Sequence, residues 1–215
     1  AGNITIDVVS GKILTYSGAA LSLGANTLTL SGGGTLSNTN ALVLNNASSK
    51  LLLNSITVDS VSTSADSSGL DIDADSTITS LSVANITPVA IADGISLSGA
   101  ITVTAGSIKL AETGTLASSI SMSGGVLDAD NSLTVSGALT QSGDIEIDIK
   151  AGKTITYTGA AISLGANKLA LTGGAVAEIR EYHRFFAGHA CSQGVAYRLS
   201  QSCSYNIRNL DDLVG

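Results

Sequence analysis

The sequence predicts an all-β solenoid, a chain that winds into stacked coils of short strands, and a fixed repeat is the first observation behind this prediction. Segments with an apolar–polar–apolar start recur every 25 residues and read LDIDA from Leu70, ISLSG from Ile95, ISMSG from Ile120 and IEIDI from Ile145. A repeat of this length is typical of solenoids, in which each coil buries its apolar side chains by stacking on its neighbours. The repeat places Leu97, Met122 and Ile147 in one column of the core.

The second observation is an internal duplication that spans this pattern. Residues Ile4–Gly33 and Ile145–Gly174 are identical at 19 of 30 positions when Ile4 is aligned with Ile145. Equivalent places in a solenoid are separated by a whole number of coils. The alternation predicts that coils begin at Ile4, Leu28, Leu51, Leu70, Ile95, Ile120 and Ile145. Six coils then separate the two copies, and the whole region holds about seven coils of 19–25 residues.

The third observation is the alternation of apolar and polar residues inside each coil. Between Ile95 and Leu110 the chain reads ISLS, ITVT and SIKL, three short runs whose alternate side chains face one way. Glycines such as Gly99 and Gly106 fall between the runs, where a tight turn often needs a positive φ angle. An antiparallel sandwich also contains many short strands and is the alternative fold. The single phase of the repeat favours the solenoid.

Composition excludes several classes of protein. The 215 residues carry a formal charge of −7, and only 13% of them are charged, whereas a nucleic-acid-binding protein needs a basic face. No run of roughly 18 apolar residues is present, so no transmembrane helix is expected. No signal peptide is visible because strand-like alternation begins at Ile4, and we expect either a mature form or a piece excised from a longer protein.

Residues 1–174 resemble a known group of β-solenoids. The likeness lies in repeated strand motifs, LTLSG from Leu28, ISLSG from Ile95 and LTVSG from Leu133. These motifs are similar to those in the right-handed parallel β-helices of large bacterial surface proteins, such as filamentous-haemagglutinin-type adhesins and autotransporter passengers. The resemblance implies right-handed coils, a bacterial source, and a location outside the cell or on its surface.

Residues 175–215 break the pattern and form a separate region. All four arginines, both histidines and both cysteines lie here, and all six lysines lie before it. Apolar residues at Val176, Ile179, Tyr182 and Phe186 predict a helix over residues 175–187. The region is too short to fold alone, so we expect a C-terminal cap or an oligomerisation tail. The abrupt change of composition suggests a separate origin for it, and a homo-oligomer through the tail or the solenoid ends is expected.

Candidate metal ligands are few. His183, His189, Cys191 and Cys203 are zinc-ligand types, but their spacing matches no standard zinc motif. Cys191 and Cys203 are a candidate disulfide in an extracellular protein, and two free thiols are the alternative. Acidic clusters lie at residues 71–75, 128–130 and 144–148, and Asp71, Asp73 and Asp75 alternate on one predicted strand as weak calcium candidates. The simpler interpretation of these clusters is a solvated outer face.

The sequence favours a structural, adhesin-like segment without enzymatic activity and without a cofactor. The alternative is a carbohydrate-active or carbohydrate-binding β-helix with a glycan partner, because acidic residues are available, although no aromatic platform accompanies them. Ice binding is a further alternative. It depends on Thr-x-Thr pairs, of which the pairs beginning at Thr77 and Thr102 lie one 25-residue repeat apart.

Overall fold

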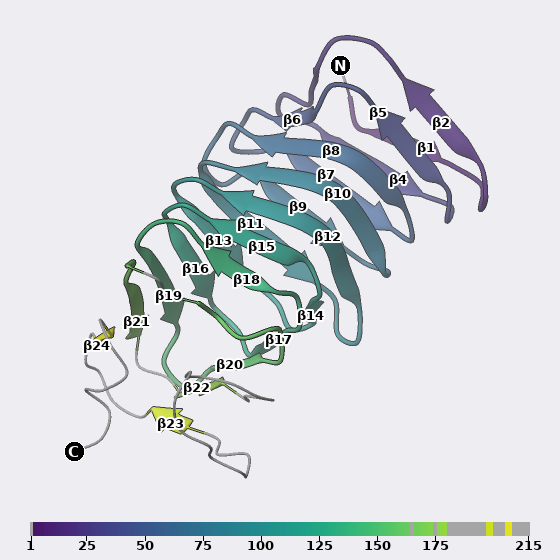
Figure 1. Ribbon diagram of the computed structural model, residues 1–215. Helices are drawn as coiled ribbons and strands as arrows, with labels where there is room; N and C mark the ends of the chain where they lie inside the picture. The colour runs from purple at the N-terminus through teal and green to yellow at the C-terminus, as the bar shows by residue number, and fades with distance from the viewer. Residues whose placement is uncertain (1, 164–165, 174–175, 180–196, 200–204, 208–215) are drawn as a thin grey trace.

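The fold is a stack of β-coils (Figure 1). The computed structural model describes residues 2–163, 166–173, 176–179, 197–199 and 205–207, and every regular element in this part of the chain is a β-strand. The strands gather into two sheets that run parallel from the N-terminal coil to the last coil. The predicted solenoid is therefore confirmed, and the antiparallel sandwich is wrong.

The first sheet takes one short strand from every coil. Its parallel strands in the described residues are, in order, β1 (Ile4–Asp7), β4 (Thr27–Ser31), β7 (Lys50–Asn54), β9 (Gly69–Ile72), β11 (Ile86–Ile91), β13 (Ser107–Leu110), β16 (Val126–Ala129), β19 (Ile145–Ile149) and β21 (Leu169–Gly173). Strands of the second sheet separate each pair in sequence, so every connection is the crossover that a parallel sheet requires.

The second sheet has two rows. The main row is β2 (Ile13–Tyr16), β5 (Thr35–Asn38), β8 (Thr57–Thr63), β10 (Ser76–Val83), β12 (Ser96–Val103), β14 (Thr115–Leu116), β17 (Leu133–Val135), β20 (Thr154–Tyr157) and β22 (Val176–Ile179). The shorter row holds β3 (Leu21–Ser22), β6 (Leu42–Leu44), β15 (Ser119–Met122) and β18 (Leu139–Gln141), which continue the second halves of β8, β10 and β12.

The long strands turn a corner between their two halves. The pairing of β10 with β12 shifts register between Ile78 and Ser80, and Gly99 opposite this shift has a φ angle of 115°. A Cβ atom at Gly99 would overlap the carbonyl oxygen of Ile78 in the neighbouring coil. Glycine is therefore required at this corner, both for its backbone conformation and for the close approach of the two coils.

After Leu70 the coils are shorter than the 25-residue repeat predicts. Paired positions step from Ile4 to Leu28, Leu51, Leu70, Val89, Leu110, Ala129, Ile149 and Gly173. The first three steps, of 24, 23 and 19 residues, are the predicted ones, and each of the five steps from Leu70 to Gly173 is shorter than the predicted 25 residues. Eight such steps separate β1 from β21 in the described residues, compared with about seven predicted coils.

The predicted 25-residue repeat is wrong because it joins strands from different sheets and from different rows of the second sheet. ISLSG from Ile95 lies in the first half of β12, whereas ISMSG from Ile120 lies in β15, which pairs with the second half of β12. Both segments bury alternate apolar side chains, so they look alike without occupying equivalent places. The predicted core column is wrong for the same reason: Leu97 pairs with Leu116, Met122 with Val103, and Ile147 with Leu127.

The internal duplication does span a whole number of coils, as predicted, but the number is seven instead of six. Aligning the two copies superposes β1 on β19 and β2 on β20, and it superposes β4 on β21. Even the register is repeated, because Ile13 pairs with Thr35, and their equivalents Thr154 and Val176 pair with each other. The two copies therefore occupy equivalent places at opposite ends of the stack.

A continuous apolar core runs along the stack. One column of the first sheet contains Leu28, Leu51, Leu70, Val89 and Leu110, none of which is more than 3% exposed. Burial of each such side chain contributes about 1.5–3 kcal/mol relative to an exposed one. Since each side chain covers the one before it, the core depends on the contact between successive coils.

Polar side chains at the turns bind the backbone of the next coil. The Oδ1 atoms of Asn3, Asp66 and Asp75 accept hydrogen bonds from backbone N–H groups one coil further on, at 2.8–2.9 Å. Asn38 is only 3% exposed, and its amide group bonds both the N–H and the C=O of Ser60 in the next coil. These bonds satisfy backbone groups that the strand ladders leave free at the corners.

The C-terminal part differs from the sequence prediction. Val176–Ile179 form β22, so the helix predicted over 175–187 is wrong in this stretch, and its residues 180–187 lie outside the described part of the chain. The apolar residues have a helical spacing, but the segment forms a strand because it pairs with the free edge of β20. Two further strands pair antiparallel with the last coil, β23 (Tyr197–Leu199) with β22 and β24 (Tyr205–Ile207) with β21.

The corner glycine leads to a test of the coil packing. Replacing Gly99 by Ala should lower the free energy of unfolding by about 3 kcal/mol or more, because the new methyl group meets the backbone of Ile78 and the φ angle is strained. Gly152→Ala is the matched control, since Gly152 also has a positive φ angle, of 75°, but open space around its Cα, and about 1 kcal/mol is expected. Urea unfolding of both variants measures the difference. Equal losses would contradict the tight corner.

Candidate functional surfaces

A shallow hollow on the second sheet is lined mainly by threonine and serine residues. Its walls come from four successive coils, namely the turn before β12 and the turns and strands around β14, β17 and β20. The lining residues are Asp93, Gly94, Thr113, Gly114, Thr115, Ser132, Leu133, Thr134, Thr154 and Thr156. Parallel pairing places Thr115 beside Thr134 and Thr134 beside Thr156, so three threonines of the lining stand in one row.

Hydroxyl ladders extend beyond the hollow. Ser96 pairs with Thr115 and so lengthens the row of threonines by one coil. A second row holds Thr35, Thr57, Thr77 and Ser98, and the hydroxyl oxygens of Thr77 and Ser98 are 2.9 Å apart. The predicted stacking of Thr77 on Thr102 is wrong, because Thr102 pairs with Ser82 and Ser121 in the other row of the sheet.

The chemistry of the hollow suits a neutral polar ligand. Each threonine or serine hydroxyl donates one hydrogen bond and accepts others, and successive strands repeat the row at about 4.8 Å. The single carboxylate in the lining belongs to Asp93. Hydrolysis of a glycosidic bond uses a pair of carboxylic groups, and this lining holds one.

The outer face of the first sheet carries a charged cluster. The Lys109 Nζ atom lies 2.9 Å from an Asp130 oxygen and 3.4 Å from an Asp128 oxygen, and Lys150 approaches Asp130 at 3.7 Å. Asp128 also pairs across the sheet with Asp148, a like charge. The cluster connects β13, β16 and β19, and it is the densest group of charges around one lysine in the described structure.

The two aspartates of this cluster respond oppositely to their surroundings. Burial raises the pKa of Asp128, and the attraction of Lys109 only partly opposes this effect. The hydrogen bond from Lys109 lowers the pKa of Asp130, and the same hydrogen bond raises the pKa of Lys109. Lys109 is therefore shared unequally, with Asp130 as its main partner.

The weak calcium candidates do not form a common site. Asp71 lies in β9 between Leu52 and Ala90 of the neighbouring strands, and Asp73 follows the strand on an exposed turn. The Asp75 carboxylate accepts the backbone N–H of Ser96 at 2.8 Å. Across the described residues, no three His, Cys, Asp or Glu side chains are grouped to hold a metal ion. The zinc and disulfide candidates His183, His189, Cys191 and Cys203 lie outside those residues.

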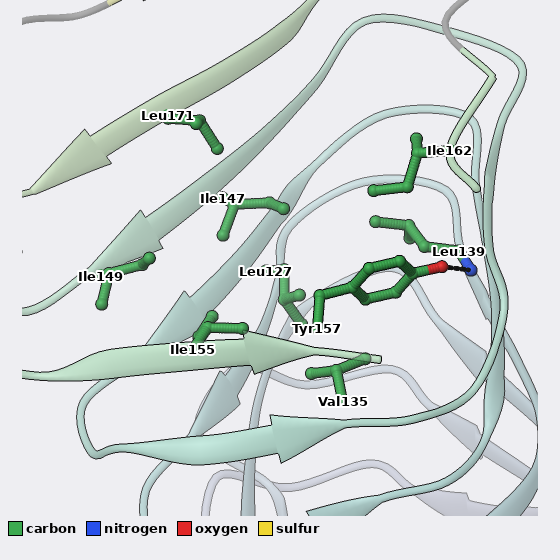
Figure 2. A pocket seen from close by; sticks show the side chains of 9 residues that line it. All are labelled: Leu127, Val135, Leu139, Ile147, Ile149, Ile155, Tyr157, Ile162 and Leu171. Carbon is green, nitrogen blue, oxygen red and sulfur yellow. Dashed lines mark hydrogen bonds between the residues drawn. The ribbon is translucent and has the colours of Figure 1, made fainter. Parts of the chain in front are cut away.

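A small apolar cavity lies inside the last coils (Figure 2). Its volume is about 20 Å³, and its lining is Leu127, Val135, Leu139, Ile147, Ile149, Ile155, Tyr157, Ile162 and Leu171. The Tyr157 hydroxyl donates to the carbonyl oxygen of Ala160 at 2.5 Å and accepts the backbone N–H of Leu139 at 3.1 Å. Burial raises the pKa of Tyr157. Because the Tyr157 hydroxyl already makes these two hydrogen bonds, the cavity is a gap in the packing and offers no binding group.

Comparisons with protein-family models, with curated proteins and with solved structures find no match to this chain. The described residues include no helix of the length and hydrophobicity needed to cross a membrane.

Sequence reasoning missed the hollow and the charged cluster, because both depend on the register. Asp128 and Asp148 stood out as parts of separate acidic runs, but their pairing with each other and with Lys109 requires coils shorter than the predicted repeat. The usable signal was the alternation within Ser107–Leu110 and Val126–Ala129, which places Lys109 and Asp128 at the same position of successive strands.

The charged cluster leads to a paired prediction on pH. Because the pKa of Asp130 is lowered by folding, its contribution to stability is present above about pH 4, the usual range for Asp, and is lost as the pH falls through the folded pKa. Asp130→Asn should therefore lose up to about 1 kcal/mol at pH 7 and less near pH 3, where part of that contribution is already gone.

Asp128→Asn is the matched variant with the opposite sign. Its raised pKa favours the protonated form in the folded state, so that contribution is fully present below about pH 4 and is lost as the pH rises through the folded pKa. Relative to the native chain, Asp128→Asn should gain stability between pH 3 and pH 7. Denaturant unfolding at both pH values measures the two changes, and changes of the same sign would contradict the unequal sharing of Lys109.

Proposed function

We propose that this chain is a non-enzymatic structural segment, similar to an adhesin stalk, of an extracellular bacterial protein. The observation that carries the proposal is the continuity of the stack, in which one core and two parallel hydrogen-bonded sheets pass through every coil from β1 to β21. Its bacterial and extracellular setting is inferred from the strand motifs LTLSG and LTVSG.

Stiffness follows from the way each coil is held. Backbone ladders join it to both neighbours in each sheet, and turn side chains such as Asn38 and Asp75 add bonds between coils. Bending the stack would break bonds of both kinds on one side. A spacer that keeps a binding part away from a cell surface needs this resistance.

The outer faces suit presentation to solvent or to a polar surface. Hydroxyl ladders cover much of the second sheet, and charged side chains are sparse. Hydroxyl groups keep the strands soluble without the mutual repulsion that a dense single-sign charge would produce. The same faces repeat with each coil, which gives a surface a series of equivalent contact points.

A distance measurement tests the spacer role. Lys12 and Lys153 are equivalent positions of the two sequence copies, seven coils apart, so their backbones should lie about 34 Å apart along the stack axis. Spin labels at Lys12→Cys and Lys153→Cys, with Cys191 and Cys203 changed to Ser, should give one narrow distance distribution by pulsed electron resonance. The distribution should stay unchanged between low and high salt. A broad or multimodal distribution in folded protein would overturn the spacer role.

A second candidate function is carbohydrate binding at the hydroxyl-lined hollow. The row of Thr115, Thr134 and Thr156 beside Asp93 favours it, because these groups match the donors and acceptors of sugar hydroxyls. The absence of a paired carboxylate from this lining makes binding without cleavage the relevant chemistry.

An array of bacterial and host polysaccharides tests the binding candidate. If the hollow binds sugar, Thr134→Lys should abolish retention on the glycan, because the long cationic side chain occupies the centre of the row. Thr140→Lys is the matched control, since Thr140 is an exposed threonine in the other row of the same sheet. Equal retention by both variants, or none by the native chain, would contradict a glycan site in the hollow.

A further inference from the structure

The N-terminal coil has one open side. Strands β1, β2 and β3 pair with β4, β5 and β6 in the second coil, and their other edges have no partner among the described residues (Figure 1). Apolar side chains line this open side: Ile4 is 57% exposed, Leu14 42% and Leu21 37%. Exposed strand edges beside exposed apolar groups form a surface suited to another strand.

The sequence copy near the other end shows what covers this surface. Ile145, Ile155 and Ile162 are the equivalents of Ile4, Leu14 and Leu21, and they are 4%, 4% and 7% exposed. The difference arises from the preceding coil, in which β16 pairs with β19, β17 pairs with β20, and Leu139 lines the same cavity as Ile162. The first coil thus has the side chains of a covered coil without its cover.

The hydrogen bonds of two equivalent tyrosines, Tyr16 and Tyr157, show the same difference between the first coil and a covered coil. Tyr16 donates to the carbonyl oxygen of Ala19 at 2.9 Å, as Tyr157 donates to that of Ala160. Tyr157 also accepts the N–H of Leu139 from the preceding coil, as Figure 2 shows. Tyr16 has no counterpart of that N–H in the described part of the chain. The Tyr16 hydroxyl oxygen could accept a backbone N–H from a coil that preceded the first copy as residues 126–141 precede the second.

The residue before each copy also has the same role. Asn3 Oδ1 accepts the N–H of Thr27 at 2.9 Å, and Oδ1 of Asp144, the equivalent residue before the second copy, accepts the N–H of Lys168 at 2.8 Å. A chain that passed from Asp144 directly to Ile4 would keep this bond, because the carboxylate replaces the amide oxygen. The join between copies is therefore already present in the structure, as the step from Asp144 to Ile145.

We propose that the open side of the first coil is a docking surface for one further parallel β-coil with the pattern of residues 126–141, in the same polypeptide. Residues 4–144 are then a seven-coil module that can be joined end to end. A second copy of the chain fits less well. Its last strands, β21 and β22, are already paired with β24 and β23, and two N-terminal coils facing each other would meet antiparallel, without an N–H at the place of Leu139.

A tandem chain tests the proposal, with residues 1–144 followed directly by residues 4–215. Hydrogen–deuterium exchange is measured on residues 4–23 of the inner copy. That copy carries Ser10→Ala, so that its peptides differ in mass from those of the outer copy. Alanine is the natural residue at the equivalent position, Ala151. Exchange there should be at least tenfold slower than in the single chain and similar to that of residues 145–163. The tandem chain should also unfold in one transition.

The matched control is the same tandem chain without Asp144 at the junction. A slip of one residue turns every inward side chain outward, so protection of the inner segment should be lost. Tyr157→Phe in the single chain and Tyr16→Phe in the inner copy should both speed exchange nearby, whereas Tyr16→Phe in the single chain should have little effect. Unchanged exchange in the inner copy, two separate transitions, failure to fold, or a single chain that is already a dimer with protected residues 4–23 would each overturn the proposal.

Discussion

The structure depends on one requirement, that each coil must match its neighbours both in hydrogen bonding and in side-chain columns. Parallel strands about 4.8 Å apart leave room for one layer of inward side chains per coil. Leu51 covers Leu28 and is covered by Leu70, so no coil has a core of its own.

The corners are where this requirement is hardest to meet, and they explain much of the composition. At Gly99 a bend brings two backbones together, and a side chain cannot fit. Elsewhere the chain turns through polar residues, and Asn38 and Asp75 bind the backbone of the next coil. The richness in glycine, serine, threonine and asparagine thus reflects turns that occur several times in every coil, and the flat strands between them leave room for the hydroxyl rows and the Lys109 cluster.

The sequence was sufficient for the class of fold but not for its register. Alternation reveals which side chains face inward, and the duplication of Ile4–Gly33 at Ile145–Gly174 reveals equivalent ends. It does not reveal which strands share a row, because ISLSG and ISMSG have the same pattern in different rows. The hollow and the partners of Lys109 required that register. In Val176–Ile179 the local helical spacing was overridden by a free strand edge, which is a tertiary effect.

The short, nearly constant coil length has a consequence for how the chain reaches this structure. Parallel pairing joins residues that are one coil apart in the sequence, whatever the total number of coils. The entropy lost in closing each loop grows only with the logarithm of that separation, so it is nearly the same for every coil added. Folding is therefore a process of nucleation and outward growth, with a slow first pair of coils and a barrier that does not increase with length. The coils between Leu51 and Ile149 are the shortest, so their closure cost is the smallest, although by a narrow margin.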